Sequence, residues 1–357
     1  MNPSPEDTST PSGQSRGAAR LAVGIATVVL AAAGVAFFAS DGRELLRAAG
    51  EVSWVRILIP IIATILSYAT MAASYEGIAR AASTPIGFSA MHRITYVSNT
   101  INYMVSTGGL SGFAVRMYFF RKNGIPLGRA VTISFVQGLI TNLTLLFFLI
   151  FAFIFLLTHE SLSPAALASA AVALLIFTVA TLLLVGLFLH APTRRKTIRW
   201  IIGGIYTLSR RILGPARAPS KVSLLRLGHN IDDGLAFMQK NGGAMIAPIA
   251  FIIADWFLTL GVLWGCFFAL GLDVPFALIS VGFAIGILST LVSITPAGIG
   301  IMESAVTTIF VALGQPLEPT IIAVILFRMI FYALPFGMSI AFFHGMFQDA
   351  RKHTQLS

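Results

Sequence analysis

Long apolar stretches, separated by short polar segments, dominate the hydropathy pattern of this chain. Six of them run without interruption, over residues 21–39, 55–75, 127–157, 165–189, 244–270 and 319–346. Each is close to or above the ~20 residues that an α-helix needs to cross a bilayer. Because a backbone in hydrocarbon must satisfy its own hydrogen bonds, we predict six membrane-spanning helices. They are named spans 1, 2, 4, 5, 6 and 8 in chain order.

Two further apolar regions, 91–123 and 276–314, are interrupted by glycine or proline. Each has a longer arm, a break and a shorter arm of ~13 residues, which as a helix covers about 20 Å of a ~30 Å hydrocarbon core. We therefore predict a re-entrant helical hairpin, or a bent pair of helices, in each region. The residues expected to break the helices are Gly108, Gly109, Gly112, Pro296, Gly298 and Gly300.

The distribution of lysine and arginine orients these elements, because basic residues collect in cytoplasmic loops. Ten of the 24 basic residues lie in segment 190–243, and others flank the first and last spans. We predict a cell-membrane protein with a disordered cytoplasmic tail at 1–19 and a second cytoplasmic tail at 349–357. This orientation is consistent along the whole chain only if each broken region begins and ends on the same side of the membrane. The first outer loop fits it least well, since it carries Arg43 and Arg47.

The predicted elements occur twice in the same order, and every element of the second half runs in the opposite direction. Local pairs recur at a nearly constant offset along the chain, at Pro60 and Pro248, Tyr68 and Trp256, Thr107 and Thr295, Gly112 and Gly300, and the turns 124–126 and 314–316. Inverted repeats with broken helices are typical of transporters. We predict an all-α polytopic membrane protein with two inverted-topology repeats, 20–160 and 161–348. Each would contain three spanning helices and one broken, re-entrant hairpin.

Composition limits the possible functions. The chain is 56% hydrophobic and 11% charged, so topology and contact with anionic headgroups account better than nucleic acid for the net charge of +10. The single cysteine, Cys266, allows no disulfide within the chain, and no cysteine or histidine has metal-ligand spacing. Nucleophile-elbow, phosphate-loop and zinc-protease motifs do not occur. We expect no metal, no cofactor and no enzymatic activity.

Segment 190–243 is predicted to be a basic cytoplasmic loop. Within it, residues 220–241 alternate at roughly helical spacing, with Val222, Leu225, Leu235 and Met238 against Arg226, Asp232, Asp233 and Lys240. Two interpretations fit this pattern equally well. One is a helix on the inner membrane surface, and the other is a plain linker helix.

Glu303 is the most informative charged residue in the apolar regions. It lies in the first turn of the half-helix that opens after Pro296, Gly298 and Gly300, where free N–H groups and the helix dipole favour an anion. A carboxylate at membrane depth is costly and usually functional. The two interpretations are local capping of its own helix and a role in the substrate path.

Arg116 occupies the related position of the first broken region. If the hairpins meet on a pseudo-two-fold axis, Arg116 approaches Glu303, and a lipid phosphate competes for its guanidinium, which suits phosphate geometry. The alternative is a side chain that extends to the inner headgroups.

Arg328 and Asp255 lie within predicted spans 8 and 6, where extension to the headgroups is difficult. For Arg328 we expect an internal partner or a substrate contact, with Glu303 and Asp255 as candidate partners. Asp255 is either part of that site or a hydrogen-bonded structural carboxylate. Weaker polar signals come from Gln137 and Asn142 in span 4 and from Asn99 and Asn102 in the first hairpin. Buried amides of this kind often simply link helices.

Two segments resemble a known family. Residues 295–314, TPAGIGIMESAVTTIFVALG, resemble the Pro-x-Gly-x-Gly-x-x-Glu signature of the lysylphosphatidylglycerol synthase transmembrane-domain family, which is also described as flippase-like. Residues 102–126, NYMVSTGGLSGFAVRMYFFRKNGIP, resemble its first-half glycine motif, and Arg328 matches an arginine expected in the last span. The resemblance covers about residues 20–350.

The resemblance implies movement of lipids between leaflets. Fused bacterial members translocate aminoacylated phosphatidylglycerol, which gives resistance to cationic antimicrobial peptides, and they carry a C-terminal aminoacyltransferase domain. This chain ends soon after span 8, so we expect a stand-alone member without that domain. Many relatives have a Glu-Arg pair about where Gln137 and Gly138 stand, and this departure leaves the lipid unspecified.

We therefore predict a translocator of a phosphate-containing lipid such as aminoacylated phosphatidylglycerol. Its headgroup would be contacted by Arg116, Arg328, Glu303 and Asp255. The alternatives are a secondary transporter of a soluble solute and a non-transporting partner of a lipid-modifying or glycosyltransferase enzyme. The expected partners are membrane lipids, and either a second copy of the chain or such an enzyme, but no nucleic acid.

Overall fold

The computed structural model describes residues 47, 49–104, 109–158, 164–215, 218–291 and 298–342. In this part of the chain the secondary structure is helical and contains no strand, which confirms the predicted all-α class there. Predicted span 1 (21–39), the two tails, Gly108 and Pro296 lie outside the described residues.

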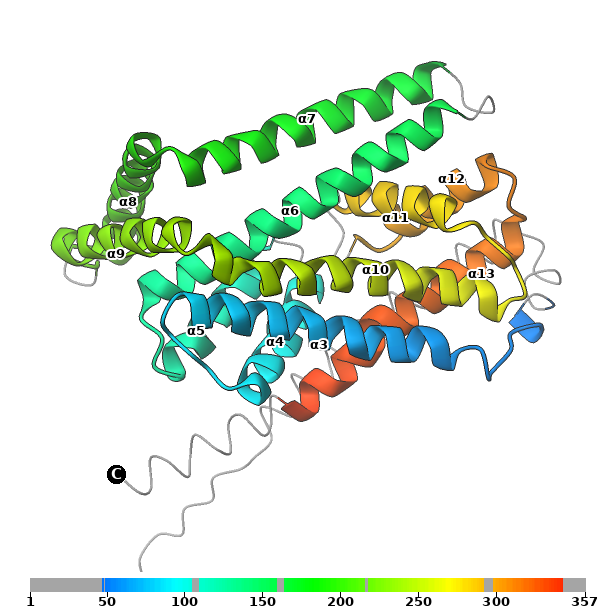
Figure 1. The fold of residues 1–357 in the computed structure, drawn as a ribbon, viewed down its shortest axis with the longest axis horizontal. Helices are drawn as coiled ribbons and strands as arrows, with labels where there is room; N and C mark the ends of the chain where they lie inside the picture. The colour runs from blue at the N-terminus through cyan, green and yellow to red at the C-terminus, as the bar shows by residue number, and fades with distance from the viewer. Residues whose placement is uncertain are drawn as a thin grey trace, which may run out of the picture.

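Within the described residues, five helices are long and apolar enough to cross a membrane. They are α3 (Leu58–Ala81), α6 (Leu127–Leu157), α7 (Pro164–Leu189), α10 (Ile246–Ala269) and the helix that begins as α13 (Leu317–Arg328) and continues to Phe342. These helices correspond to predicted spans 2, 4, 5, 6 and 8. In Figure 1, α3 and α10 lie side by side, while α7 packs on α6 at the edge of the bundle.

Both broken regions fold as helix pairs. The first consists of α4 (Phe88–Met104) and α5 (Leu110–Lys122), and the second of α11 (Phe276–Leu291) and α12 (Ile301–Ala312). The shorter arms have 13 and 12 residues, so each covers about 20 Å at 1.5 Å per residue. Arms of this length do not reach across a ~30 Å hydrocarbon core, as predicted.

The first hairpin begins and ends at the same end of the bundle. Arg129, in the first turn of α6, donates from Nη1 to the carbonyl oxygens of Ala82 (2.8 Å) and Ser83 (3.0 Å), which follow α3. The start of α6 therefore lies against the end of α3, with α4 and α5 between them in the chain. This is the arrangement that the charge-based topology requires of region 91–123.

In the segment predicted as a basic loop, 190–243, the described residues form two helices and a short 3₁₀ turn, and only the helix at 220–241 was predicted. The helices are α8 (Ala191–Leu213) and α9 (Lys221–Lys240), and the turn is Gly242–Met245. The prediction of a loop missed the start signals of α8. The imidazole of His190 accepts a hydrogen bond from the N–H of Thr193 (3.4 Å), and a proline occupies the first turn.

Helix α9 lies within residues 220–241, as both interpretations of this segment require. Leu235 and Met238 of α9 are buried, and Gly228 lies directly against Ile202 of α8. This side of α9 therefore packs on protein, as expected of a linker helix. Val222, at the start of α9, is exposed.

The element boundaries of the two halves recur at a nearly constant offset. The same offset relates both ends of α3 to both ends of α10, and also the start of α4 to the start of α11. A slightly larger offset relates the start of α6 to the start of α13. Gly109 and Gly300 each precede a short arm with a left-handed φ, of 94° and 83°. The structural counterpart of Gly300 is therefore Gly109. The predicted counterpart, Gly112, lies inside α5 and packs against Asn102.

Helices α3 and α10 pack through two reciprocal contacts. They run in opposite directions (Figure 1), and a Cβ atom on Gly77 would lie 2.8 Å from Cγ of Pro248. A Cβ atom on Gly265 would lie 2.9 Å from Cδ of Pro60. Each helix thus contributes one proline and one glycine, and the two contacts use equivalent residues of the two halves.

The last span contains a π-helical turn, Met329–Ala333, directly after Arg328. Pro335 follows this turn and has no N–H with which to bond the carbonyl four residues earlier. A wider turn before a helical proline is a known response to that loss. The prediction of span 8 as a plain helix did not include this feature.

Candidate functional site

Arg328 and Glu303 form an ion pair between the last span and the second hairpin. Nε of Arg328 lies 2.7 Å from Oε1 of Glu303, and the side chains are only 10% and 18% exposed. Nη2 of Arg328 also donates to the carbonyl oxygen of Gly298 (3.4 Å), and the guanidinium lies 4.5 Å from the ring centroid of Tyr332. The expected internal partner of Arg328 is thus Glu303 and not Asp255.

Glu303 also caps its own helix. The N–H of Gly300 donates to Oε2 of Glu303 at 2.8 Å, while the other carboxylate oxygen faces Arg328. The left-handed φ of Gly300 turns the chain so that α12 starts here. The expected capping role is therefore present, together with a charge partner from another helix.

Arg116 is buried in the first hairpin, with 8% of its surface exposed. Nη2 donates to Oδ1 of Asn99 (3.1 Å) and to Oγ of Ser98 (3.3 Å), and the guanidinium lies 4.2 Å from the ring centroid of Tyr75. Among the described residues, no carboxylate lies within ion-pair distance of it. The predicted approach of Arg116 to Glu303 is wrong, because Arg328 occupies that carboxylate and neutral groups of α3 and α4 hold Arg116.

Asp255 accepts a hydrogen bond from a residue of the other half. Oγ of Ser67 in α3 donates to Oδ1 of Asp255 at 2.6 Å and also lies 3.3 Å from the hydroxyl of Thr259. Ser67 and Asp255 are related by the offset that relates α3 to α10, so these equivalent positions meet where the two helices cross. This contact is the one expected of a hydrogen-bonded structural carboxylate.

Each of the two arginines lies over a tyrosine ring. Tyr75 packs under Arg116 and Tyr332 under Arg328, and Tyr103 meets Tyr332 edge-on with ring centroids 4.9 Å apart. Tyr332 had a sequence signal, because it follows Arg328 by one helical turn and so shares its helix face. Tyr75 had none, because its partner belongs to a different helix.

The weaker polar residues have different roles. Oε1 of Gln137 accepts from Oγ of Ser74 (2.7 Å), which links α6 to α3 as expected of a buried amide. Asn142 donates to the carbonyl of Gly138 in its own helix (2.8 Å) and makes no such link. Oδ1 of Asn102 is buried without a hydrogen-bond partner among the described residues.

The polar groups form two chemically distinct sites. The Arg328–Glu303 pair is neutral as a unit, since each charge has its opposite in contact. Arg116, by contrast, is a buried cation whose partners among the described residues are neutral, and its Nε makes no hydrogen bond to any of those residues. A guanidinium in this state has donors left for an anion such as a phosphate.

Together these features define a polytopic helical membrane protein with charged and polar side chains held between its spans and hairpins. The profile of the lysylphosphatidylglycerol synthase transmembrane region matches residues 20–338. The chain belongs to this family, as its two glycine motifs had indicated. Membership associates it with the modification or translocation of membrane lipids. A comparison with curated proteins found no match.

Proposed function

We propose that this protein moves a phosphate-containing lipid between the leaflets of the cell membrane, without itself catalysing a covalent step. The family to which the chain belongs supports a lipid substrate. The acyl chains would stay in the bilayer while the headgroup passes the side chains of Arg116, Asp255, Glu303 and Arg328.

The burial of Arg116 without a carboxylate partner among the described residues is the observation that carries this proposal. A charged side chain inside a membrane protein is costly, so such groups usually pair with one another or serve function. Asn99, Ser98 and Tyr75 stabilise the guanidinium but leave its charge uncompensated. A lipid phosphate supplies the missing charge and accepts from two N–H groups at once.

Aminoacylated phosphatidylglycerol carries an ammonium group as well as a phosphate, and Asp255 suits the ammonium. This carboxylate has a neutral side-chain partner, Ser67, and lies within electrostatic range of Tyr75 and Tyr103. The same two tyrosines are within electrostatic range of Arg116. A headgroup with both charges would therefore find an anion site and a cation site near the same two tyrosines.

Glu303 and Arg328 would act as an exchangeable pair. When a phosphate approaches Arg328, Glu303 keeps the N–H of Gly300 as its second partner. Releasing Arg328 therefore does not leave the carboxylate without a hydrogen bond. The pair can open for a headgroup and close after it.

The architecture that we propose for this transport is a pair of inverted repeats with both termini in the cytoplasm. The nearly constant offset between element boundaries and the reciprocal contacts of Pro60 and Pro248 support the repeat. Two equivalent half-sites that face opposite leaflets allow alternating access.

A leaflet-sidedness assay in proteoliposomes tests the proposal. Fluorescent lysyl-phosphatidylglycerol and phosphatidylglycerol are incorporated, and the label left after dithionite reduction of the outer leaflet measures movement. We expect the protein to accelerate movement, and Arg116→Ala to abolish most of the acceleration. Asp255→Asn should reduce movement of the lysylated lipid more than that of phosphatidylglycerol.

Arg56→Ala is the matched control. Arg56 also lies over an aromatic ring and donates to a carbonyl, of Phe268, but it is exposed at the end of the bundle. This variant should move lipid at the unaltered rate. Equal rates in the Arg116→Ala and unaltered proteins would overturn the site, and uptake of a soluble solute without lipid movement would overturn the function.

A further inference from the structure

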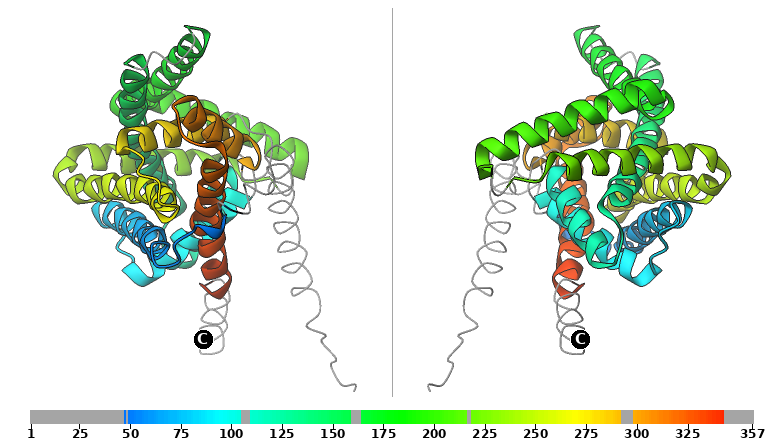
Figure 2. Two further views of the ribbon diagram at one scale, coloured as in Figure 1. Left: turned by 90° about the vertical axis from the view of Figure 1, so that its right-hand side faces the viewer. Right: turned by 90° about the vertical axis from the view of Figure 1, so that its left-hand side faces the viewer.

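Helix α8 lies across one end of the bundle. The views of Figure 2 show it crossing the ends of the spanning helices, and Figure 1 shows it nearly end-on. It starts after His190, which directly follows the end of α7 at Leu189. The helix therefore begins at the end of a predicted membrane span and runs along the surface that this end defines.

One side of α8 is apolar and exposed. Ile201, Ile205, Leu208 and Ile212 follow one another at alternating i+4 and i+3 spacing, which places them in a single row along the helix. Their exposed fractions are 46%, 45%, 58% and 71%. A continuous exposed apolar row marks a contact surface, because helices of soluble proteins usually bury their apolar side against the core.

The opposite side of α8 is basic. Lys196, Arg199 and Arg210 lie about half a turn from the apolar row at ~100° per residue, and Arg199 and Arg210 are exposed. Trp200, which is 78% exposed, and Arg211 lie between the two sides. An apolar row, a flanking tryptophan and a cationic face are the composition of helices that lie in the headgroup layer of a membrane.

Arg194 shows which way the apolar row faces. It precedes Ile201, Ile205 and Ile212 by about two, three and five whole helical turns, so it belongs to the same helix face. Its Nη1 donates to the carbonyl of Phe188 at the end of α7 (2.8 Å). The face that carries the apolar row therefore looks back toward the spanning helices, where the acyl chains of a bilayer would lie.

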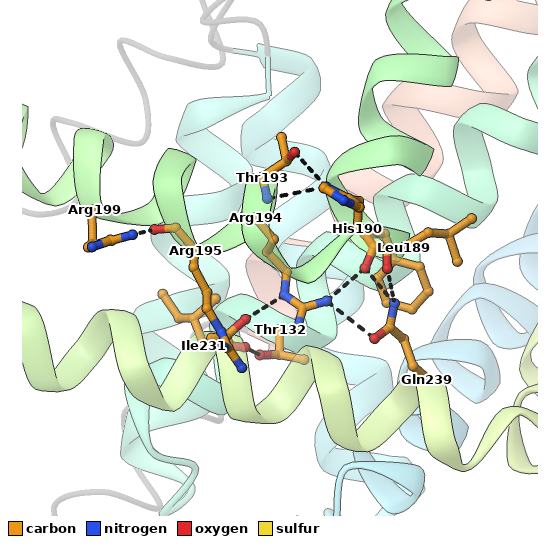
Figure 3. Close-up of polar contacts among 11 residues, drawn as sticks. Thr132, Leu189, His190, Thr193, Arg194, Arg195, Arg199, Ile231 and Gln239 are labelled. Carbon is orange, nitrogen blue, oxygen red and sulfur yellow. Dashed lines mark hydrogen bonds and ion pairs between the residues drawn. The ribbon is translucent and has the colours of Figure 1, made fainter.

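Two ion pairs to one buried carboxylate fix α8 in this orientation. Arg194 and Arg195 bind the two oxygens of Asp232 in α9 at 2.6 and 2.7 Å, and Arg194 is 1% exposed. Gln239 donates to the carbonyls of Phe188 (2.6 Å) and Leu189 (3.3 Å), which ties the end of α9 to the end of α7. Figure 3 shows Gln239 beside Leu189 and Arg194. The row cannot turn away from the spans without breaking these contacts.

We propose that α8 binds the anionic inner leaflet as an in-plane amphipathic helix. The apolar row would enter the acyl region, Trp200 would lie at headgroup level, and Lys196, Arg199, Arg210 and Arg211 would attract anionic headgroups. The charge of this face and the orientation of the row identify an anionic lipid surface as the occupant. Binding of this kind does not depend on lipid transport.

Single-cysteine labelling tests the proposal in the full chain. The one native cysteine, Cys266, is buried, and a Cys266→Ser background removes it. An environment-sensitive dye is placed at Ile205→Cys or Ile212→Cys in the apolar row, and at Arg199→Cys as the matched control on the basic face. The protein is reconstituted in phosphatidylcholine vesicles with or without phosphatidylglycerol, and doxyl-labelled lipids serve as quenchers.

We expect blue-shifted emission and quenching by doxyl lipid at Ile205 and Ile212, and aqueous emission at Arg199. Phosphatidylglycerol should increase the quenching of the dye in the apolar row by doxyl lipid, because it draws the helix deeper into the bilayer. The triple substitution Lys196→Ala/Arg199→Ala/Arg210→Ala in the Ile205→Cys background should remove this increase in quenching. Aqueous emission at all three sites would overturn the proposal. So would blue-shifted emission that doxyl lipid does not quench, since it indicates contact with protein. The dye measurements report membrane binding of α8 whether or not these variants translocate lipid, so the two proposals are tested separately.

Discussion

Arg328 reaches back from the last span to Glu303 in the second hairpin, and their ion pair spans 2.7 Å. The contact joins the first turn of α12 to the residue after which the last span becomes π-helical. It therefore fixes the broken part of the second hairpin against a point where the neighbouring helix already departs from regular geometry.

Removing one member of this pair should destabilise the protein strongly. Glu303→Gln leaves the guanidinium of Arg328 buried without its carboxylate, which costs about 3–5 kcal/mol in comparable buried pairs. The double variant Glu303→Gln/Arg328→Met removes both charges and should lose less than the sum of the single variants. Thermal unfolding in detergent measures the loss of stability in each of the two single variants and in the double variant.

Glu76→Gln is the control for that series. Glu76 pairs with Arg80 one turn away in α3, where the arginine is 68% exposed, so its loss should cost no more than about 1 kcal/mol. Additive losses in the Glu303 and Arg328 variants would contradict a mutual ion pair.

The close approach of α3 and α10 should not tolerate a methyl group. In Gly77→Ala and Gly265→Ala the new Cβ atom would lie 2.8 and 2.9 Å from a proline ring, so we expect a loss of about 1–3 kcal/mol in each. Gly261→Ala, also in α10, has open space at Cβ and should be neutral or slightly stabilising. The melting temperatures of the three variants decide this, and equal values would disprove the tight contact.

The Asp232 network should persist to low pH. Burial by itself raises the pKa of Asp232, but the hydrogen bonds and charges of Arg194 and Arg195 outweigh it, and the pKa lies below its ordinary value. A carboxylate with a lowered pKa contributes its full stabilisation above the unfolded value of about 3.9 and loses it as the pH falls through the folded value. The distance between spin labels on α8 and α9 should therefore be constant from neutral pH to about 4 and should change only below that range.

Asp232→Asn should move the labels apart at neutral pH and remove the acid transition. Asp233→Asn is the control, since its side chain is 61% exposed and its partner within α9 is His229. A transition near pH ~6 would assign the change to a histidine instead of Asp232.

The hydrogen bond between Ser74 and Gln137 should contribute to stability because both side chains are buried. Ser74→Ala leaves the amide oxygen of Gln137 without this donor, and such losses cost about 1–3 kcal/mol. Asn142→Ala removes only a bond within one helix and should have a smaller effect. Unfolding in detergent compares the two variants, and an equal loss would show that Gln137 does not link the helices.

Hydropathy and breaker residues were sufficient to predict the main elements, because these signals are local. Predicted span 4 and α6 share the bounds 127–157, and the short arms of both hairpins lie within the predicted regions. The partner of Arg328 was among the two predicted, because few carboxylates occur in the apolar regions. Contacts that depend on the angles between helices were not predictable: Arg116 is held by Asn99 and Tyr75 and not by Glu303.

Helix α8, in the first part of segment 190–243, was also missed, for a different reason. The ten basic residues of that segment were interpreted through topology, and that hid the apolar row at Ile201 and Ile205. A helix with a basic face and an apolar face satisfies both patterns at once.

The paired contacts of α3 and α10 bear on how such a chain can arise. A half-length protein with one proline and one glycine at the positions of Pro60 and Gly77 carries both members of the contact. Two copies of it, inserted in opposite orientations, would join through the same two contacts, each proline against the other copy's glycine. After fusion of the copies, a basic segment inserted within the second copy, between α7 and α10, sets a single orientation, because that segment stays on the cytoplasmic side. An ancestor with dual topology is thus compatible with this interface, and a simple tandem of parallel halves is not.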